Sequence, residues 1–577
     1  MLKLFKFLKP YQISVATVLL FTFIETLGTL YVPTLTADIV NNGVTQGNIP
    51  YIIKTGVFML LVAIFTAGTA VLNSRLSANI SSGFARDIRK ALFMKAQALS
   101  INDFHKIGTA SMITRTTSDV TLIGQTTVML MQMLLPAPVM AVAGLFLAFS
   151  KDKGIALIIV ATMLIFLLIA ALLGKKIIPL FKFIQIKMDN ITRILREIII
   201  GVRVIRAFNR ENHEKNKIDT AVTDYAANSI RINKMIATLL PVVMLVINMG
   251  IISILWLGGR RVADGQMQVG DIMALIEYCS LILFFLIMGT MMFMYIPRAQ
   301  ACAERIDEVL SMTPEITDKS SNSHPRGDYA HIEFRNVSFR YSNAAEPILS
   351  NLSFESKSGE VTAIIGGTGS GKSTIANLIP RFFEIESGSI LINGTNIRNF
   401  SQKELRDKIG FVPQKAFLFS GTIADNIRDG KANATQAEIE QAAQIAQADG
   451  FIRELKNGYQ AYVAQGGNNL SGGQKQRLTI ARALIRKPEI YIFDDSFSAL
   501  DLKTDAMLRR ALKKEIGRAT VIMVAQRIST IMEADRILVL EDGIITGTGQ
   551  HQELMQNCQV YRQIAASQLS EAELASS

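Results

Sequence analysis

Long hydrophobic stretches crowd roughly the first 300 residues, whereas the rest of the chain alternates short apolar runs with polar segments. A helix needs about 20 predominantly apolar residues to cross a bilayer. Six stretches reach that length, with edges near 14–38, 52–76, 126–150, 154–178, 236–259 and 272–297. The pattern therefore predicts six membrane-spanning helices followed by a domain that lies in water.

The links between these stretches alternate in length. Those after the first, third and fifth stretches are short, and the first of them carries no Lys or Arg. Those after the second and fourth are much longer, basic and helical in pattern, so we expect helices that continue beyond the membrane and turn near 101–114 and 199–209. Since Lys and Arg collect on the cytoplasmic side, the long links, both termini and the second half of the chain are predicted to be cytoplasmic.

The chain begins with Lys3, Lys6 and Lys9 interleaved with apolar residues. The apolar run behind them is too long for a secretory signal and lacks a small-residue cleavage site. The pattern is typical of a short interfacial helix that leads into the first span.

Few charged residues interrupt the hydrophobic stretches. Asp38 and Arg75 lie near predicted span ends, where charged groups can reach the interface. Glu25 and Glu277 are better candidates for a water-filled cavity, because ionisable groups inside a membrane are costly and usually functional. The last span ends in thioethers and aromatics, which suit either a surface for varied apolar ligands or ordinary helix packing. These residues are Met288, Met291, Met292, Phe293, Met294 and Tyr295.

Composition favours a membrane protein over other classes. Of the 577 residues, 49% are hydrophobic and 19% charged, which excludes a disordered chain and is too apolar for an ordinary soluble enzyme. The net charge of +12 is compatible with nucleic acid, but cytoplasmic Lys and Arg explain it better, and we expect no nucleic-acid partner. Cys279, Cys302 and Cys558 are too far apart for a disulfide framework, which fits a reducing cytosolic face.

After the last span the chain becomes polar, with the prolines and glycine typical of a linker. Short β-branched runs then alternate with helical patterns, as in an α/β nucleotide-binding domain. We therefore expect a transmembrane domain over 1–312, a linker over 313–330 and a nucleotide-binding domain over 331–577.

A buried strand at 361–365 runs into a glycine-rich loop and then a helix. Glycines let the backbone wrap a phosphate, so that N–H groups and the helix N-terminus face the anion. The pattern predicts ATP or GTP binding, with Lys372 at the β- and γ-phosphates and the Ser373 hydroxyl as a Mg²⁺ ligand. The predicted phosphate-binding residues are Gly366, Gly367, Thr368, Gly369, Ser370, Gly371, Lys372, Ser373 and Thr374.

Two further motifs lie downstream of this loop. An apolar strand ends in Asp494, which can hold Mg²⁺ through water, and Asp495, which can orient the attacking water. A Ser and two glycines before a helix form another anion-binding helix start, although a plain glycine turn with a capping Ser would look the same. These residues are Ser471, Gly472, Gly473 and Gln474.

Together the motifs resemble those of an ATP-binding cassette (ABC) exporter half-transporter, and the likeness covers essentially the whole chain. It implies six transmembrane helices of the type I exporter fold, fused to an α/β P-loop nucleotide-binding domain. By this resemblance 471–474 is the ABC signature and Tyr341 stacks on adenine. Gln414 would sense Mg²⁺ and the membrane domain, and Asp501 would belong to the D-loop.

The resemblance also implies an assembly. In the family two nucleotide domains pack head to tail, and each ATP lies between the phosphate loop of one subunit and the signature of the other. The regions 104–119 and 201–208 resemble the coupling segments that dock on the nucleotide domains.

Two departures from the family pattern fall in one site. Asp495 stands where the family has Glu, and Gln526 stands where it has a switch His. Aspartate is one methylene shorter, and a misplacement of about 1 Å can cost roughly 100-fold in rate. Glutamine can hydrogen-bond a phosphate but can neither titrate nor carry charge. The sequence therefore predicts a site that binds ATP and hydrolyses it slowly.

This pattern resembles the degenerate half of bacterial heterodimeric exporters, many of which export drugs. It implies ATP and Mg²⁺ as cofactors, amphipathic small molecules as substrates, and a non-identical partner with its own Glu and His. The loop before the signature departs too, with Ala464 and Gln465 in place of Gly and Glu. Two alternatives stay open: a homodimeric exporter of lipid or peptide, and a non-pumping protein such as an ATP-gated channel.

Overall fold

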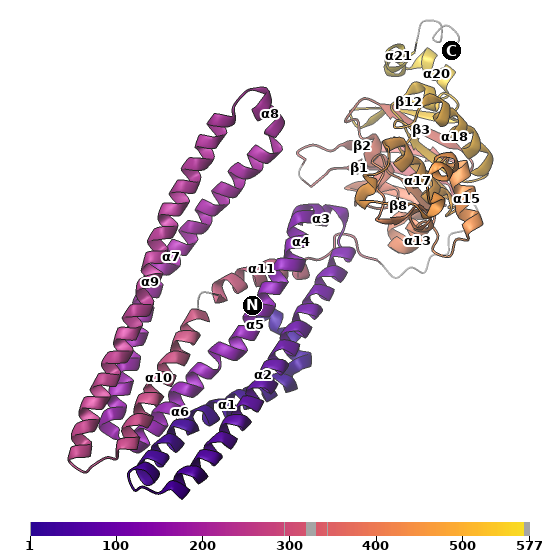
Figure 1. Ribbon diagram of the computed structural model, residues 1–577. Coiled ribbons are helices and arrows are strands. Elements are labelled where there is room, and N and C mark those ends of the chain that lie inside the picture. Colours follow the sequence, from indigo (N-terminus) through magenta and orange to yellow (C-terminus); the bar gives the residue numbers. More distant parts are fainter. Residues whose placement is uncertain (1, 293–294, 319–329, 343, 570–577) are drawn as a thin grey trace. The chain divides into compact units, whose positions relative to one another are not determined.

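The computed structural model of the chain describes residues 2–292, 295–318, 330–342 and 344–569. The chain divides into two compact units. The first comprises Met1–Gln97 and Thr109–Met312, and the second comprises Ala98–Gly108 and Thr313–Ser577. The first unit consists of long helices, and the second is a domain of strands and shorter helices (Figure 1).

Among the residues that the structure describes, six helical segments of the first unit are long and apolar enough to cross a membrane, as the hydrophobic pattern predicts. Their helices are α1 (Gln12–Asp38), α2 (Ile49–Ala98), α5 (Val120–Met129) with α6 (Pro136–Lys151), α7 (Lys153–Ile200), α9 (Glu211–Ala263) and α10 (Val269–Met292). Several run well past the predicted spans, because a helix can continue where the apolar stretch ends. Of the last one, α10 is described as far as Met292, and α11 (Ile296–Ser311) is described beyond residues 293–294. Phe293 and Met294 of the thioether-rich run lie outside the described residues.

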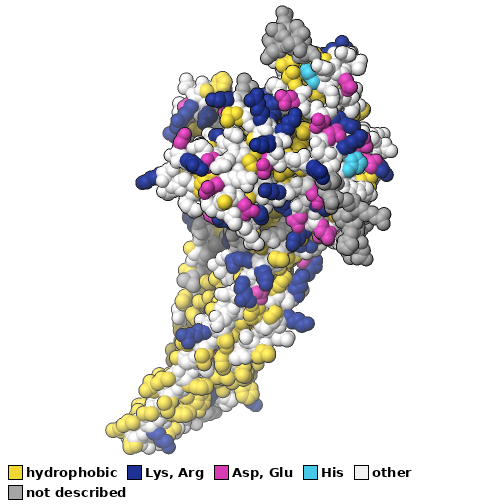
Figure 2. All heavy atoms as spheres, turned by 90° about the vertical axis from the view of Figure 1, so that its right-hand side faces the viewer, with side chains coloured by type: hydrophobic (Ala, Val, Ile, Leu, Met, Phe, Trp, Pro, Cys, Tyr) yellow, Lys and Arg dark blue, Asp and Glu magenta, His cyan; other side chains and the backbone are white. Residues whose placement is uncertain are grey.

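Apolar side chains of these helices point outward. In α2 the most apolar window is only 6% buried, and Phe65 is 62% exposed. Figure 2 shows hydrophobic side chains over much of the lower part of the helical unit. A protein in water rarely exposes contiguous apolar surface of this extent, so this surface belongs in lipid.

The charged residues of the spans occupy different environments. Asp38 is the last residue of α1, as expected for a span end. Arg75, also predicted near a span end, is exposed well inside α2, because that helix continues to Ala98. Glu277 is exposed on α10, whereas Glu25 is partly buried at the midpoint of α1.

The basic N-terminal segment forms a short 3₁₀ helix, η1 (Leu2–Tyr11). Leu4 is 1% exposed, and Lys3 Nζ lies 2.8 Å from Asp307 Oδ2. The Tyr11 hydroxyl donates to Asp87 Oδ2 at 2.9 Å. These contacts tie the segment to α11 and α2 of the same unit.

Each of the two long links contains short helices, which differ in the unit they belong to and in burial. The first link forms α3 (Ile101–Ile107), which belongs to the second unit, and α4 (Thr109–Thr114). α3 begins at a capping box in which Ser100 and Asp103 each bond the other's backbone N–H. The second link forms α8 (Val202–Ala207), none of whose residues is buried.

The second unit is built on a six-stranded sheet of order β12-β11-β3-β10-β9-β6. Its strands are β3 (Val361–Gly366), β6 (Ile409–Val412), β9 (Ile490–Asp494), β10 (Thr520–Val524), β11 (Arg536–Glu541) and β12 (Ile544–Gly549). All pair in parallel except β11 with β12. Every residue of β9 and β10 is buried, as expected for parallel strands covered on both faces.

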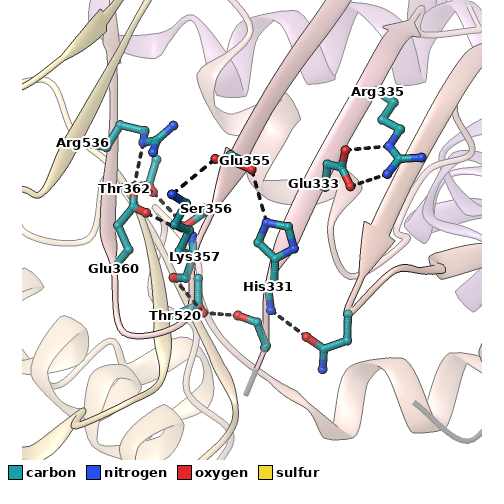
Figure 3. A network of polar contacts seen from close by, with 12 residues as sticks. His331, Glu333, Arg335, Glu355, Ser356, Lys357, Glu360, Thr362, Thr520 and Arg536 are labelled. Carbon is teal, nitrogen blue, oxygen red and sulfur yellow. Dashed lines mark hydrogen bonds and ion pairs between the residues drawn. The ribbon is translucent and has the colours of Figure 1, made fainter. Parts of the chain in front are cut away.

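A second, antiparallel sheet has the order β2-β1-β4-β5. Its strands are β1 (Ile332–Phe339), β2 (Leu349–Ser356), β4 (Ser387–Ile392) and β5 (Thr395–Asn396). A polar network links it to the first sheet (Figure 3). The Thr362 hydroxyl donates to Ser356 Oγ at 2.7 Å, and Arg536 Nε lies 2.8 Å from Glu360 Oε1. These bonds fix the start of β3 against β2 and β11.

Helices cover the six-stranded sheet. They include α12 (Lys372–Leu378), α17 (Gly472–Leu484), α18 (Leu502–Glu515), α19 (Ile528–Ile531), α20 (His551–Asn557) and α21 (Gln559–Ala566). His551 Nδ1 and the Tyr561 hydroxyl are 2.7 Å apart and hold α20 against α21. Burial lowers the pKa of His551. The three cysteines are free and buried.

Candidate functional site

The site lies at the carboxyl ends of four parallel strands. In open sheets with helices on both faces, ligands bind at this edge. β3 leads into the glycine-rich loop, β6 into Gln414, β9 into Asp494 and Asp495, and β10 into Gln526. Sheet pairing therefore brings together residues that lie up to about 160 positions apart in the sequence.

The glycine-rich loop has a backbone that only glycine adopts easily. Gly369 and Gly371 have φ angles of +84° and +97°. A Cβ on Gly366 would lie 2.0 Å from the carbonyl oxygen of Leu540. The loop can therefore curl tightly between β3 and α12, as phosphate binding requires.

Lys372 is held over this loop. Its Nζ donates to the carbonyl oxygens of Gly366 and Gly367 at 3.0 and 2.6 Å. Burial lowers the pKa of Lys372 below its ordinary value, and the nearby carboxylates of Asp494 and Asp495 offset only part of this fall. The Ser370 hydroxyl is buried without a hydrogen-bond partner among the described residues. A cation and an unsatisfied hydroxyl on the same loop fit an anionic ligand such as a phosphate group.

The residues predicted to hold Mg²⁺ meet beside the loop. Ser373 Oγ donates to Asp494 Oδ1 at 2.7 Å, and Asp494 is 5% exposed. Burial raises the pKa of Asp494 above its ordinary value, and the bond from Ser373 offsets only part of this rise. A hydroxyl, a carboxylate and the Gln414 amide oxygen are hard oxygen ligands of the kind that Mg²⁺ prefers. Bound there with nucleotide, Mg²⁺ would neutralise charge that develops on the phosphates.

Asp495 directly contacts Gln526. Gln526 Nε2 donates to Asp495 Oδ2 at 2.7 Å, and Gln414 Nε2 donates to the same oxygen at 3.1 Å. Asp495 is 7% exposed, and its φ of +48° holds the side chain in place. Burial raises the pKa of Asp495 above its ordinary value, and the bonds from Gln414 and Ser498 offset only part of this rise. The two residues that depart from the family pattern thus form a single hydrogen-bonded unit.

The sequence did not point to Gln568, which holds the loop around Gln526. Its side-chain amide donates to the Gln526 carbonyl oxygen and accepts from the Ile528 N–H, both at 2.8 Å. Arg527, between these two residues, donates to the Ser498 carbonyl oxygen at 3.3 Å. The loop after β10 is therefore fixed from the C-terminal end of the chain and from the loop after β9.

Tyr341 lies beside the phosphate-loop helix. Its hydroxyl and Thr374 Oγ1 are 3.1 Å apart. Edge-to-face contacts with Phe339 and Phe383, at centroid distances of 4.8 and 5.3 Å, hold the ring. An aromatic ring fixed next to the phosphate loop can stack on a nucleotide base.

The predicted signature opens α17 at the surface. Ser471 Oγ accepts from the Gln474 N–H, and Gln474 Oε1 accepts from the Ser471 N–H. Ser471 and Gly472 are exposed, and within the described residues no hydrogen bond joins 471–474 to the glycine-rich loop. Asp501 is exposed and caps α18 through the Thr504 N–H, which lowers the pKa of Asp501. The structure thus gathers the phosphate-loop residues in one place and leaves the signature apart from them.

The loop before the signature is strongly turned. Gly466 and Gly467 have φ angles of +66° and +67°. The Ala464 N–H donates to Asn469 Oδ1 at 2.9 Å, and Gln465 is exposed. Both departures in this loop therefore fall on a rigid surface turn.

Helix α3, which overlaps the predicted coupling region 104–119, contacts the residue that follows Tyr341. Ser342 Oγ donates to Asn102 Oδ1 at 2.7 Å, and Asn102 Nδ2 donates to Glu315 Oε2 at 2.8 Å. Asp103, 3% exposed, accepts the Glu315 N–H at 3.0 Å. α3 is thus fastened next to Tyr341 within the second unit.

Two family models match the chain: "ABC transporter transmembrane region" over residues 15–287 and "ABC transporter" over residues 349–498. An uncharacterized ABC transporter ATP-binding protein of Mycobacterium tuberculosis is 38% identical over 569 residues, which are 97% of each chain. An ATP-dependent lipid A-core flippase of Desulfotalea psychrophila is 32% identical and covers 86% of this chain and 87% of that protein. The solved structure of a bacterial Atm1-family ABC exporter with ATP bound matches with a TM-score of 0.82 at 25% identity. That match covers 97% of this chain and 99% of the other.

Proposed function

The chain belongs to the ABC transporters, as an exporter half-transporter whose ATPase domain drives transport, and we propose that it is the degenerate-site subunit of a heterodimeric drug exporter. A non-identical half-transporter supplies the catalytic Glu and the switch His. The substrates are small amphipathic molecules. The pair spans the cytoplasmic membrane, with the nucleotide-binding domains and the termini of this chain in the cytoplasm.

The contact between Asp495 and Gln526 carries this proposal. One carboxylate oxygen of Asp495 accepts two amide hydrogens, from Gln526 and Gln414. An oxygen that already accepts two hydrogen bonds is a poor general base for water, and neither amide can take up a proton. General-base catalysis contributes about 100-fold or more, so ATP bound in this site is hydrolysed slowly.

The signature supports a role in a different site. Its capping box satisfies the N–H groups of Ser471 and Gln474 and leaves those of Gly472 and Gly473 at an exposed helix start. Such groups bind a γ-phosphate that approaches from outside. The signature therefore completes the ATP site whose phosphate loop belongs to the partner.

A transport cycle follows from this asymmetry. ATP in both sites closes the two nucleotide domains, and the extended helices carry the closure to the spans, which turn the cavity outward. Hydrolysis in the partner's site reopens the dimer, while the site of this chain retains nucleotide longer. ATP and its hydrolysis products favour different conformations, and this difference supplies the drive.

A homodimeric lipid exporter is the second candidate. Relatives named as ATP-dependent lipid A-core flippases match most of the chain. In a homodimer, the signature of each copy would lie against the phosphate loop of the other, so the two sites would be equivalent and the isolated chain would be the complete ATPase.

ATPase measurements on the purified chain separate these candidates. The chain alone should bind ATP yet turn it over about 100-fold more slowly than the reconstituted pair. Lys372→Ala in the same preparation controls for contaminating ATPases. Fast turnover by the isolated chain that disappears in Lys372→Ala would contradict the heterodimer and favour the homodimer.

A further inference from the structure

Glu25 is a carboxylate at the midpoint of a membrane-spanning helix, α1. Within the described part of the chain it forms no ion pair with Lys, Arg or His, and its side chain is partly buried. An ionised group inside a membrane is retained only where something stabilises it.

A polar side chain of α2, Asn73, contacts this carboxylate and leaves an acceptor of its own unused. Asn73 Nδ2 donates to Glu25 Oε2 at 3.1 Å and to Thr22 Oγ1 at 3.2 Å. Asn73 is 5% exposed, and its Oδ1 has no hydrogen-bond partner among the described residues. The Ser77 hydroxyl, one turn further along α2 and 0% exposed, also has none. The cluster therefore offers a negative charge and a free carbonyl oxygen, which together suit a ligand that is cationic and donates hydrogen bonds.

An apolar pocket of about 590 Å³ lies between α1 and α2 close to this cluster. Gly28, one helical turn from Glu25, lines it together with Phe58, Phe65 and Thr66. Its volume is in the range that holds drug-sized molecules, which is roughly 300–1,000 Å³. Aromatic walls also attract organic cations.

We propose that Glu25 and Asn73 bind the protonated amine of amphipathic ammonium substrates, whose apolar part occupies the pocket between α1 and α2. This site rests on the proposed export of amphipathic molecules and names their chemical class. The Glu25 carboxylate supplies charge complementarity, and the Asn73 carbonyl oxygen selects cations that carry N–H groups.

Binding of a fluorescent primary ammonium, monodansylcadaverine, to the full-length chain with its partner in lipid nanodiscs tests the site. Glu25→Gln, close in shape to the original, should weaken binding about tenfold or more, and Asn73→Val should weaken it severalfold. The analogue with an N,N,N-trimethylated terminal amine has no N–H on its cationic group, so it should bind wild type less tightly and be indifferent to Asn73→Val. Glu304→Gln removes an exposed carboxylate of α11 and should leave binding unchanged.

Equal binding of monodansylcadaverine to wild type and Glu25→Gln, or to empty nanodiscs, would overturn the site and leave the pocket to lipid chains. Equal binding of the ammonium and trimethylammonium dyes by wild type would overturn the role of Asn73. The binding assay needs no ATP, so Glu25-dependent binding without ATP-driven dye flux into vesicles would refute the export proposal alone. Flux that ignores Glu25 would refute the site alone.

Discussion

The phosphate loop and the signature helix start are both glycine-rich anion sites, yet the chain treats them differently. Lys372 is 8% exposed and bonded to the carbonyl oxygens of its own loop, and the neighbouring Asp495 is held by two amides. Ser471 and Gly472 are exposed at the start of α17. Under the proposed heterodimer, the chain contributes more to hydrolysis through the surface that it offers to a partner than through its own nucleotide pocket.

Gly472→Asp, tested in the assembled pair, should have the largest effect, because it tests directly whether the signature serves the competent ATP site. A carboxylate at this helix start repels the partner's γ-phosphate, so ATP turnover should fall about 100-fold or more. A Cβ on Gly472 would meet no atom within 4 Å, so the chain should still fold. Asn468→Asp adds the same charge at an exposed residue of the preceding loop and should retain most of the activity. Turnover unchanged in Gly472→Asp would remove the signature from the competent site.

Lys372→Ala should have a smaller effect on turnover than Gly472→Asp. Loss of a buried charged hydrogen-bond donor weakens nucleotide binding in this chain's site about 10- to 100-fold. Photolabelling with an azido-ATP would report that loss, and steady-state ATPase activity of the pair should fall less. If Lys372→Ala and Gly472→Asp reduce turnover equally, the two sites are equivalent.

Restoring the family residues should reduce the difference in hydrolysis rate between the two ATP sites of the pair. Asp495→Glu combined with Gln526→His lengthens the carboxylate and replaces an amide with a titratable ring, so hydrolysis in this site should rise about tenfold or more. Asp495→Glu alone should gain less, because Gln526 can still bond the new carboxylate. Vanadate trapping, resolved for each subunit, would measure the change, and unaltered nucleotide retention would contradict the proposed cause.

Gln568→Ala should give the smallest effect. It removes two hydrogen bonds from the backbone around Gln526, each worth about 1 kcal/mol, so nucleotide should leave this site a few times faster. Gln568→Glu keeps the bond to the Ile528 N–H and should be intermediate. Gln563→Ala, at an exposed residue of α21, should leave the release rate unchanged.

Hydrophobic pattern and glycine spacing sufficed for the six spans and for the phosphate loop. These features are local, because a span needs only a long apolar run, and Gly369 and Gly371 lie next to the lysine that they position. The helical pattern of the basic links also predicted that helices continue past the apolar stretches. α2 continues to Ala98, although its apolar stretch ends near residue 76.

Contacts between distant segments could not be predicted. Gln568 lies 42 residues beyond Gln526, and only the packing of α21 brings the two together. The contact of Asp495 with Gln526 likewise depends on the pairing of β9 with β10, although the resemblance had placed both residues in one site. Glu25 itself was the sequence signal for this cluster, whereas its contact with Asn73 depends on how α1 packs against α2.

The second long link turns at α8, and the exposed apolar side chains beside this helix bear on how the subunit is assembled. Ile199, Ile200 and Phe208, which flank α8, are 71%, 77% and 73% exposed. Chaperones and proteases recognise exposed apolar side chains of this kind on unassembled subunits. If the proposed partner covers this segment, a copy synthesised in excess of that partner would leave these side chains exposed to quality control, and the two polypeptides would accumulate in equal number.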